Sequence, residues 1–473
     1  MVQLMIVHPA TYEPERRYIY DIMFGEFLGI SYQAIIGDDP GTTVISVCGD
    51  SSGKRLVVHE ELFATIPDKW LTEESLPHQP LDKWMLPDAF CDTPKLSSEI
   101  PVIYGQKAMK GSYYDEGNDV ILLGLDVFGS ALFMLTRYEE VVRSDRDVHD
   151  RFPAAASLAY QEGFLDRPIV NEYLEVLWAC MKRLWPGLQR KEWRYDVFLT
   201  HDVDHPLAVY GKPWLDVVLS CGADILRRRD AHLAAQRFHA RWLGRNGDFD
   251  TDPFNSFEYI MSLSEVHNLR SAFYFMAVQN GTLFDPSYSI EHPWIRQLIR
   301  RISQRGHEIG FHGSYNSYDD EDTFIDEVTV FHRATEQEEI IQTSMGGRQH
   351  YLRWAAPKTW EIWARAQLDY DSTLMFPEQA GFRCGTCYEY TVYSLTSRCP
   401  LQLTELPLMI MEVSLLGHQY MHLGVEQACN VVATMARRCR IFNGTLSMLW
   451  HNSSLCSRNE RTAYSRIIET VCC

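Results

Sequence analysis

Two carboxylates end an apolar run in "VFLTHDVDHP", from Val197 to Pro206. Asp202 and Asp204 are two residues apart, a spacing that puts both side chains on one face of a β-strand. Carboxylates this close repel one another unless a cation or a proton lies between them. The pair therefore indicates metal binding or acid–base chemistry. A solvated strand end or a helix cap is the alternative.

A second strand end, in "GHEIGFHGSYNSY", offers half of a metal site. Alternating residues 307–311 lead to His312, but the residue four positions later is Asn316 instead of a second histidine. An amide oxygen is a poorer donor than an imidazole nitrogen to a borderline-soft ion such as Zn²⁺. Three interpretations stay open: an unusual ligand, a site without metal, and a polar loop in which Asn316 caps the turn.

A third stretch, "GGRQHYLRW", packs Arg348, His350 and Arg353 into six residues. An arginine beside a carboxylate pair would hold one carboxylate ionised and oriented. The alternative is a surface arginine pair around a buried Tyr351. His350 could replace the missing imidazole, so that His350 and Asn316 are equal candidates for a third metal ligand.

A fourth stretch, "TLSMLWHNSS", delivers His451 at the end of an apolar strand, with Leu449 two residues earlier on the same face. Taken alone, this histidine would be interpreted as a structural residue.

The elements that must position these residues are alternating strands and helices. Apolar strands recur in "DVFLTHDVDH", "SAFYFMA", "HEIGFHGS", "HYLRWAAP" and "FNGTLSMLWHNSS", with amphipathic helical patterns at 293–306 and 357–370 between them. This alternation predicts parallel β-strands in an α/β barrel or a doubly wound sheet. In such folds the chemistry lies at the carboxyl ends of the strands, where these polar residues fall.

The first 190 residues show another texture. Strands are predicted in "QLMIVHP", "YQAIIG", "TVISVCG" and "DVILLGLD", and a helix from Arg167 stops at Pro186. Residues 188–195 look like a connector. We therefore expect an accessory α/β domain at 1–190 and a catalytic domain at 191–473. The first should shape the substrate groove or an oligomer contact, because it gathers no cluster of chemical residues.

Composition excludes several classes of protein. The 473 residues carry a net charge of −19, which disfavours extended contact with nucleic acid or with anionic lipid headgroups. We expect no signal peptide, and the most apolar stretch, from Val120, is too short to span a bilayer. A cytoplasmic protein without membrane insertion is therefore predicted. "CGTC", Cys384 to Cys387, is interpreted as a turn, with a redox motif or half of a zinc site as the alternative.

Together, the four stretches resemble the motifs of the polysaccharide deacetylase superfamily (the NodB-homology or carbohydrate esterase four family), over roughly residues 195–451. The resemblance implies a distorted (β/α) barrel, with the N-terminal α/β domain as an addition. Stretches such as "DVFGSALFMLTRYEE" and "AGFRCGTC" look like a bacterial branch linked to surface polysaccharide biosynthesis. The departure from the family pattern is Asn316, which stands where the family has its second metal histidine.

The resemblance also implies roles. Asp202 would be the catalytic base and His451 the catalytic acid, with Arg353 or Arg348 tethering the base; we assign the tether to Arg353 and a substrate contact to Arg348. Metal ligands would be Asp204 and His312, with Asn316 or His350 as the third. Leu449 would line a pocket for the acyl methyl group, and Tyr315 would stack on a sugar ring.

The implied reaction is hydrolysis of an amide or ester by water that one divalent metal ion activates. Zn²⁺ is the first expectation, with Mn, Co, Ni or Fe as alternatives. The expected substrate is an acetylated or formylated amino sugar of a lipopolysaccharide or capsule pathway, in free, nucleotide-linked or lipid-linked form. A homo-oligomer is possible.

Other classes remain as alternatives. A glycosidase would also use two carboxylates, but these should lie about 5–9.5 Å apart on separate elements, not two residues apart on one strand. An inactive carbohydrate-binding protein could arise if Asn316 had abolished the site. An amidohydrolase acting on a non-sugar amide is the third.

Overall fold

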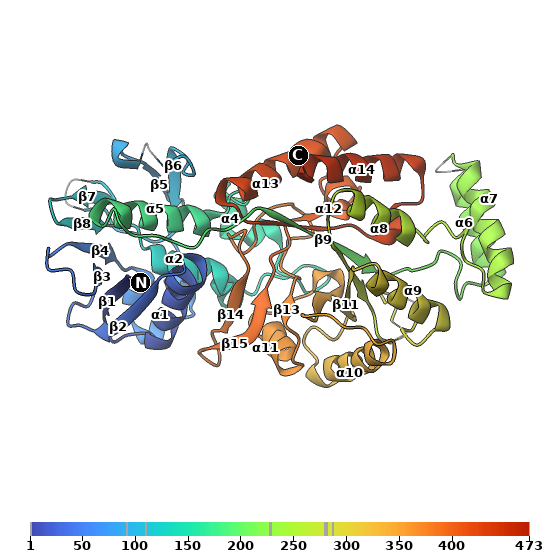
Figure 1. Cartoon of the computed structure of the whole chain (residues 1–473), viewed down its shortest axis with the longest axis horizontal. Coiled ribbons are helices and arrows are strands. Elements are labelled where there is room, and N and C mark those ends of the chain that lie inside the picture. The colour runs from blue at the N-terminus through green and yellow to red at the C-terminus, as the bar shows by residue number, and fades with distance from the viewer. Residues whose placement is uncertain are drawn as a thin grey trace.

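Two β-sheets organise the chain, one before residue 124 and one after residue 195 (Figure 1). The computed structural model describes residues 2–90, 93–108, 111–226, 229–278, 282–285 and 288–472. The first sheet has six strands in the order β2-β1-β3-β4-β8-β7. They are β1 (Gln3–His8), β2 (Ser31–Ile36), β3 (Thr42–Val47), β4 (Arg55–His59), β7 (Tyr114–Glu116) and β8 (Val120–Leu123).

The helices of this first part are α1 (Glu13–Tyr20), which continues as a π-helical segment to Phe27, α2 (Val127–Leu135), α3 (Tyr138–Val142), α4 (Leu158–Gln161) and α5 (Ile169–Leu184). A separate ribbon pairs β5 (Asp82–Met85) with β6 (Glu99–Val102). The strands and the long helix predicted from the sequence are confirmed here.

The second sheet has nine strands in the order β14-β15-β13-β12-β11-β10-β9-β17-β16. Its strands run parallel except for β14, which is antiparallel to β15. They are β9 (Asp196–Val203), β10 (Ser271–Phe275), β11 (Glu308–Gly313), β12 (Gly346–Gln349), β13 (Tyr370–Asp371), β14 (Tyr390–Ser394), β15 (Cys399–Glu405), β16 (Ile410–Met411) and β17 (Thr445–Leu449). The predicted α/β class is confirmed, and the sheet stays open, with β14 and β16 as its edges.

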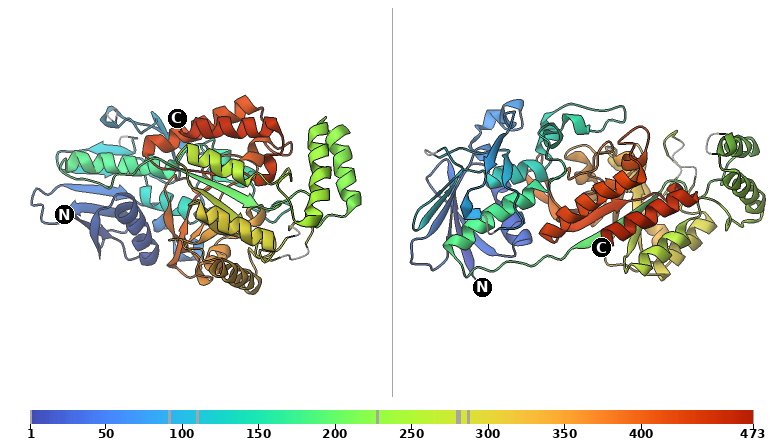
Figure 2. Two further views of the ribbon diagram at one scale, coloured as in Figure 1. Left: turned by 45° about the vertical axis from the view of Figure 1, so that its right-hand side comes forward. Right: turned by 90° about the horizontal axis from the view of Figure 1, so that it is seen from above.

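Helices alternate with these strands as predicted. They are α8 (Phe257–Val266), α9 (Pro293–Gln304), α10 (Glu321–Gln337), α11 (Lys358–Arg365), α12 (Glu412–Leu416), α13 (Val425–Phe442) and α14 (Arg458–Cys472). Between β9 and α8 the chain forms a further pair, α6 (Trp214–Leu226) and α7 (Ala231–Leu243), which stands apart from the other helices at one end of the molecule (Figure 2). No helix in the described ranges is long and apolar enough to cross a membrane.

The prediction that a strand begins at His350 is wrong. β12 instead ends at Gln349, because Tyr351 and Leu352 take left-handed backbone conformations that stop an extended strand (φ 60° and 54°). β12 also lies unusually close to β11. A Cβ atom on Gly347 would come within 1.7 Å of the Phe311 carbonyl oxygen, so this register requires glycine.

The two parts share one hydrophobic core, which continues from the first sheet into the second. Buried ion pairs join them as well. Arg383 donates two hydrogen bonds to Glu140, at 3.0 and 2.6 Å, and Arg137 donates to the same carboxylate and to the Arg383 carbonyl oxygen. Burial raises the pKa of Glu140, but the two guanidinium groups outweigh this effect and hold it below its ordinary value. A domain boundary at residue 190 stays a prediction.

We predict that Glu140→Gln lowers the free energy of unfolding by about 3–5 kcal/mol, because it leaves two buried guanidinium groups without their shared counter-charge. Equilibrium urea denaturation of the full chain measures the change. The matched control is Glu13→Gln, which removes an exposed ion pair with Arg17 and should cost under about 1 kcal/mol. Equal effects of the two substitutions would contradict the prediction.

Candidate active site

The predicted residues lie together at the carboxyl ends of the parallel strands of the second sheet. Asp202 lies on β9, His312 on β11 and Arg348 on β12, and His451 follows β17. β17 lies next to β9 in the sheet. Where β11 pairs with β12, His312 lies directly opposite Arg348. The sheet topology thus brings together residues that are up to about 250 positions apart in sequence.

Asp204, His312 and His350 form a cluster that could hold a metal ion. One ligand atom from each lies within 4.8 Å of the others. Asp204 Oδ1 is 3.1 Å from His312 Nε2 and 3.5 Å from His350 Nε2. The structure therefore brings His350, not Asn316, to the position of a third ligand.

Both imidazole rings are fixed in their orientation by hydrogen bonds from their Nδ1 atoms. His312 Nδ1 donates to the Arg348 carbonyl oxygen at 2.8 Å, and His350 Nδ1 donates to the Asp285 carboxylate at 3.1 Å. Each ring thus presents its Nε2 atom to Asp204. Histidine ligands of metals are commonly fixed in this way by an acceptor on the other nitrogen.

The electrostatics of the cluster are those of close, opposite charges. Burial raises the pKa of Asp204, but His350 and His312 outweigh this effect and hold it well below its ordinary value. Burial lowers the pKa of His350, but the carboxylates of Asp204 and Asp285 reverse the shift and raise it to about 9. Asp204 is therefore ionised, as a metal ligand must be.

The backbone beside the cluster is strained. Tyr351 and Leu352, which follow His350, have positive φ angles, a conformation that costs non-glycine residues about 1–2 kcal/mol each. Strain of this kind concentrates at functional sites. Here it turns the chain sharply after His350 and places the ring of Tyr351 next to it, with 4.7 Å between the ring centroids.

The arginine that contacts the predicted base is Arg348, and our assignment of the tether to Arg353 is wrong. Arg348 Nη1 donates to Asp202 Oδ1 at 2.7 Å and to the Thr200 hydroxyl at 2.9 Å, while its Nε donates to the Ser372 carbonyl oxygen. Arg348 is fully buried below the site. Its predicted role as a substrate contact is therefore wrong as well.

Arg353 holds the loop that follows β11. It donates to the carbonyl oxygens of His149 and Tyr315, at 2.7 and 2.5 Å, and to Asn316 Oδ1 at 3.3 Å. Asn316 thus contacts Arg353 and is exposed. Tyr315 is buried beneath Phe284, with 4.3 Å between the stacked rings, and does not line the pocket at the cluster.

His451 lies on the other side of Asp204, with Nε2 at 3.4 Å from Asp204 Oδ2. Its Nδ1 donates to Glu412 Oε1 at 2.6 Å. Burial lowers the pKa of His451, but Glu412, Asp204 and Asp202 outweigh it and raise the pKa to about 10. Sequence reasoning missed Glu412, although it follows the apolar run "LPLMIM" directly and so shows the same strand-end pattern.

A pocket of about 200 Å³ opens onto these groups. Its polar wall includes Asp202, Asp204, His350 and His451, and Leu449 also lines it, although its contact with an acyl group stays a prediction. The remaining lining residues are Arg151, Tyr351, Leu352, Pro377, Met411, Val413, Gln419 and Tyr420.

The first part of the chain reaches this pocket through the loop between α3 and α4. Arg151 is buried at the rim, where it donates to the Tyr351 carbonyl oxygen at 2.8 Å and pairs with Asp147. His149 Nδ1 is 2.9 Å from the Tyr315 hydroxyl. The sequence placed no site residue before residue 190, and these contacts form only in the folded chain.

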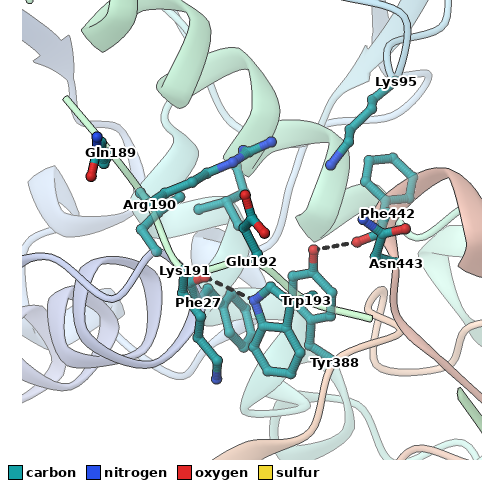
Figure 3. A pocket seen from close by; sticks show the side chains of 12 residues that line it. Phe27, Lys95, Gln189, Arg190, Lys191, Glu192, Trp193, Tyr388, Phe442 and Asn443 are labelled. Carbon is teal, nitrogen blue, oxygen red and sulfur yellow. Dashed lines mark hydrogen bonds between the residues drawn. The ribbon is translucent and has the colours of Figure 1, made fainter. Parts of the chain in front are cut away.

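A larger cavity lies away from this chemistry, where the connector meets both parts (Figure 3). Its volume is about 730 Å³, and its wall carries Trp193 stacked on Tyr388 at 4.2 Å. Lys95 and Arg190 border it, but both pair with Glu175, at 3.2 and 2.9 Å. This single carboxylate therefore offsets part of their combined charge.

"CGTC" supplies no reactive thiol. Cys384 and Cys387 are buried free cysteines, and burial raises the pKa of Cys384 to about 12. A thiol that stays protonated is neither a nucleophile nor a ligand at neutral pH.

Comparison with known proteins adds a family match in the first part of the chain. Residues 4–186 match the model of a family described as "Family of unknown function (DUF7033)". This match covers less than half of the chain and ends before the first residue of the cluster. No protein with a curated description matches the sequence.

Three solved structures are similar to the chain, each over 60% of its length. They are a "putative polysaccharide deacetylase from Mycobacterium smegmatis" (18% identity, 85% of that chain, TM-score 0.38), a "probable Polysaccharide deacetylase from Pseudomonas aeruginosa PAO1" (12%, 86%, 0.35) and "Puue Allantoinase" (14%, 85%, 0.35). Similarity at these identities and TM-scores assigns no function to the chain. A functional assignment therefore has to rest on the geometry of the site.

We predict that His350→Ala weakens the binding of Zn²⁺ at least ~10-fold, because it removes one of three ligands. Asn316→Ala should leave the affinity unchanged, since the Asn316 amide contacts Arg353. Competition against a chromophoric chelator measures both. A loss of affinity in Asn316→Ala that matches the loss in His350→Ala would show that the ligand set is wrong.

Proposed function

We propose that the protein is a metal-dependent hydrolase that removes an acyl group from the nitrogen of an amino sugar. The observation that carries the proposal is an arrangement of two groups around the Asp204 cluster. Asp202 and His451 flank it, and each is held by its own buried partner, Arg348 or Glu412. A base and an acid on either side of one reacting centre are what amide hydrolysis requires.

A divalent cation fits the donor set of Asp204, His312 and His350, because two Nε2 atoms and one ionised carboxylate oxygen converge there. When bound, it supplies Lewis-acid chemistry, which polarises a carbonyl group and makes water more acidic. Zn²⁺ is the ion we propose, since two imidazoles and one carboxylate with open positions suit it.

Asp202 acts as the base in this proposal. The salt bridge to Arg348 fixes the orientation of its carboxylate. Its second oxygen, Oδ2, is 3.8 Å from His312 Nε2 and so faces the cluster. From there it can take a proton from the attacking water.

His451 acts as the acid. The Glu412 carboxylate accepts a hydrogen bond from Nδ1–H and stabilises the imidazolium form, so that Nε2 carries the proton to be donated. Nε2 faces the pocket from the side of β17, opposite Arg348. A leaving amine held between the cluster and His451 would receive that proton as the bond to carbon breaks.

The size of the pocket and its lining support a small acyl group on one sugar ring. Leu449, Met411 and Val413 form an apolar end that suits an acetyl methyl group. Tyr351 lines the pocket and is 38% exposed, and the ring of Phe284, 42% exposed, lies next to it outside the lining, with 5.6 Å between the centroids. Exposed aromatic faces beside a pocket suit the apolar face of a sugar. A non-sugar amide would need no such rim.

We place the substrate among acylated amino sugars of bacterial surface polysaccharides, such as lipopolysaccharide or capsule. Support for this part is the sequence resemblance. Incubation of the Zn²⁺-loaded protein with N-acetylated and N-formylated amino sugars, followed by assay of released acetate or formate, tests the proposal. No release from any of them, with full metal occupancy, would refute it.

We predict that Asp202→Asn abolishes turnover while the protein still binds one metal ion per chain, because Asp202 is not among the three ligands. His451→Ala should slow turnover by ~10²-fold or more with metal content unchanged. Steady-state kinetics and elemental analysis measure both. Loss of metal in either variant would move that residue into the coordination shell.

Glu412→Gln tests whether Glu412 acts through His451. It should lower kcat by ~10-fold or more and shift the basic limb of the pH–rate profile to lower pH, because the imidazolium loses its counter-charge. A merely structural role would lower kcat without moving the pH profile.

We predict that Phe284→Ala raises KM for a sugar amide about 10-fold with little change in kcat. A small non-sugar amide should show no change in KM. The matched control is Phe238→Ala, an exposed phenylalanine on α7, away from the site. Equal KM values for the sugar amide in Phe284→Ala and in the unsubstituted protein would contradict a sugar-binding rim.

A further inference from the structure

The paired helices α6 and α7 expose apolar residues that soluble helices usually bury. On α6, Leu215, Leu219 and Leu226 are 68%, 64% and 80% exposed, and Val218 and Ile225 are also exposed. Leu215, Leu219 and Leu226 are spaced by four and seven residues, and Leu215, Val218 and Ile225 by three and seven, so the five residues form one stripe along the helix. We refer to them as the α6 stripe.

The inner face of the same helix pair buries apolar residues, among them Val217 and Ala240, together with one ion pair. Asp224 on α6 and Arg237 on α7 are both buried, and Arg237 Nε donates to Asp224 Oδ2 at 2.9 Å. The pair thus has its own small interior, and the α6 stripe lies outside it. A helix of this kind matches an apolar or interfacial environment on its outer face better than it matches water.

The charge of this segment is opposite to that of the chain. Residues 211–247 contain seven lysines and arginines and three aspartates, a net charge of +4, whereas the whole chain carries −19. At the start of α6, the guanidinium carbons of Arg241 and Arg245 lie 5.1 and 5.2 Å from the Trp214 ring centroid. An apolar stripe flanked by cations and tryptophan is typical of a helix that lies in a membrane interface.

We propose that α6 and α7 dock the protein on an anionic lipid bilayer, with the α6 stripe entering the headgroup region and the basic residues facing lipid phosphates. A second copy that docks through its own α6 and α7 is the less favourable occupant, because it would bring two segments of charge +4 together. Docking of this kind leaves the protein peripheral and needs no spanning helix.

The docked orientation has a consequence for the active site. α6 begins at Trp214, ten residues after Asp204, and so lies close in sequence to the strand ends that carry the cluster. When the α6–α7 helix hairpin is docked, it therefore holds these strand ends close to the bilayer. If the proposed function holds, amides on lipid-linked sugars become the accessible substrates, but lipid binding itself does not depend on the reaction.

Co-sedimentation with vesicles tests the proposal directly. The full chain should bind vesicles that contain phosphatidylglycerol and phosphatidylcholine, bind pure phosphatidylcholine vesicles at least ~10-fold more weakly, and dissociate in about 1 M salt, where charges are screened beyond about 3 Å. Equal binding to both kinds of vesicle, or no binding to either, would overturn it.

Variants separate the two contributions. Leu219→Gln combined with Leu226→Gln should weaken binding at least ~10-fold through lost apolar contact, and Arg229→Gln about 5-fold through lost charge. The matched control is Ile341→Gln, which changes a residue that is 93% exposed outside the hairpin and should bind like the unsubstituted chain. Unchanged lipid binding in the double leucine variant would overturn the proposal. So would sedimentation velocity showing a dimer that this variant converts to monomer, because the stripe would then be a self-association surface.

Discussion

The site is organised around the charge of Asp204. Its two oxygens lie within 3.5 Å of three imidazoles, those of His312, His350 and His451. A carboxylate so enclosed is stable only when positive charge surrounds it, whether from protonated rings or from a cation. Each ring can face Asp204 only if its other nitrogen has a hydrogen-bond partner. The charge of Asp204 therefore also determines which groups must lie behind the three rings.

Those partners come from segments far apart in the chain. They are a backbone carbonyl of β12, Asp285 in the loop before α9, and Glu412 after β16. The loop before residue 153 then braces the rim through Arg151. The active edge is thus coupled to the docking of the first part of the chain. A perturbation of that interface should reach the site even though the first part contributes none of the proposed metal ligands.

Sequence patterns predicted the elements better than they predicted the contacts. Strand and helix periodicity located β9, β11 and β17 and put Asp202, His312 and His451 at their ends. The choice between Arg348 and Arg353 could not be made in this way, because both are near the end of one strand and a left-handed turn at Tyr351 and Leu352 separates them. Nor does periodicity reveal that His350 turns toward Asp204 while Asn316 turns toward Arg353. Such outcomes depend on partners more than 30 residues away.

The strained turn after His350 shows how a third imidazole can be supplied without the usual spacing. Two left-handed residues cost about 1–2 kcal/mol each, whereas binding of a structural Zn²⁺ ion is worth about 10–16 kcal/mol in small zinc domains. The strain is therefore small beside what a complete ligand set gains. The same turn places the exposed ring of Tyr351 next to His350 and offers its carbonyl oxygen to Arg151. Ligand position, rim aromatic and contact with the first part of the chain thus follow from one local distortion of the backbone.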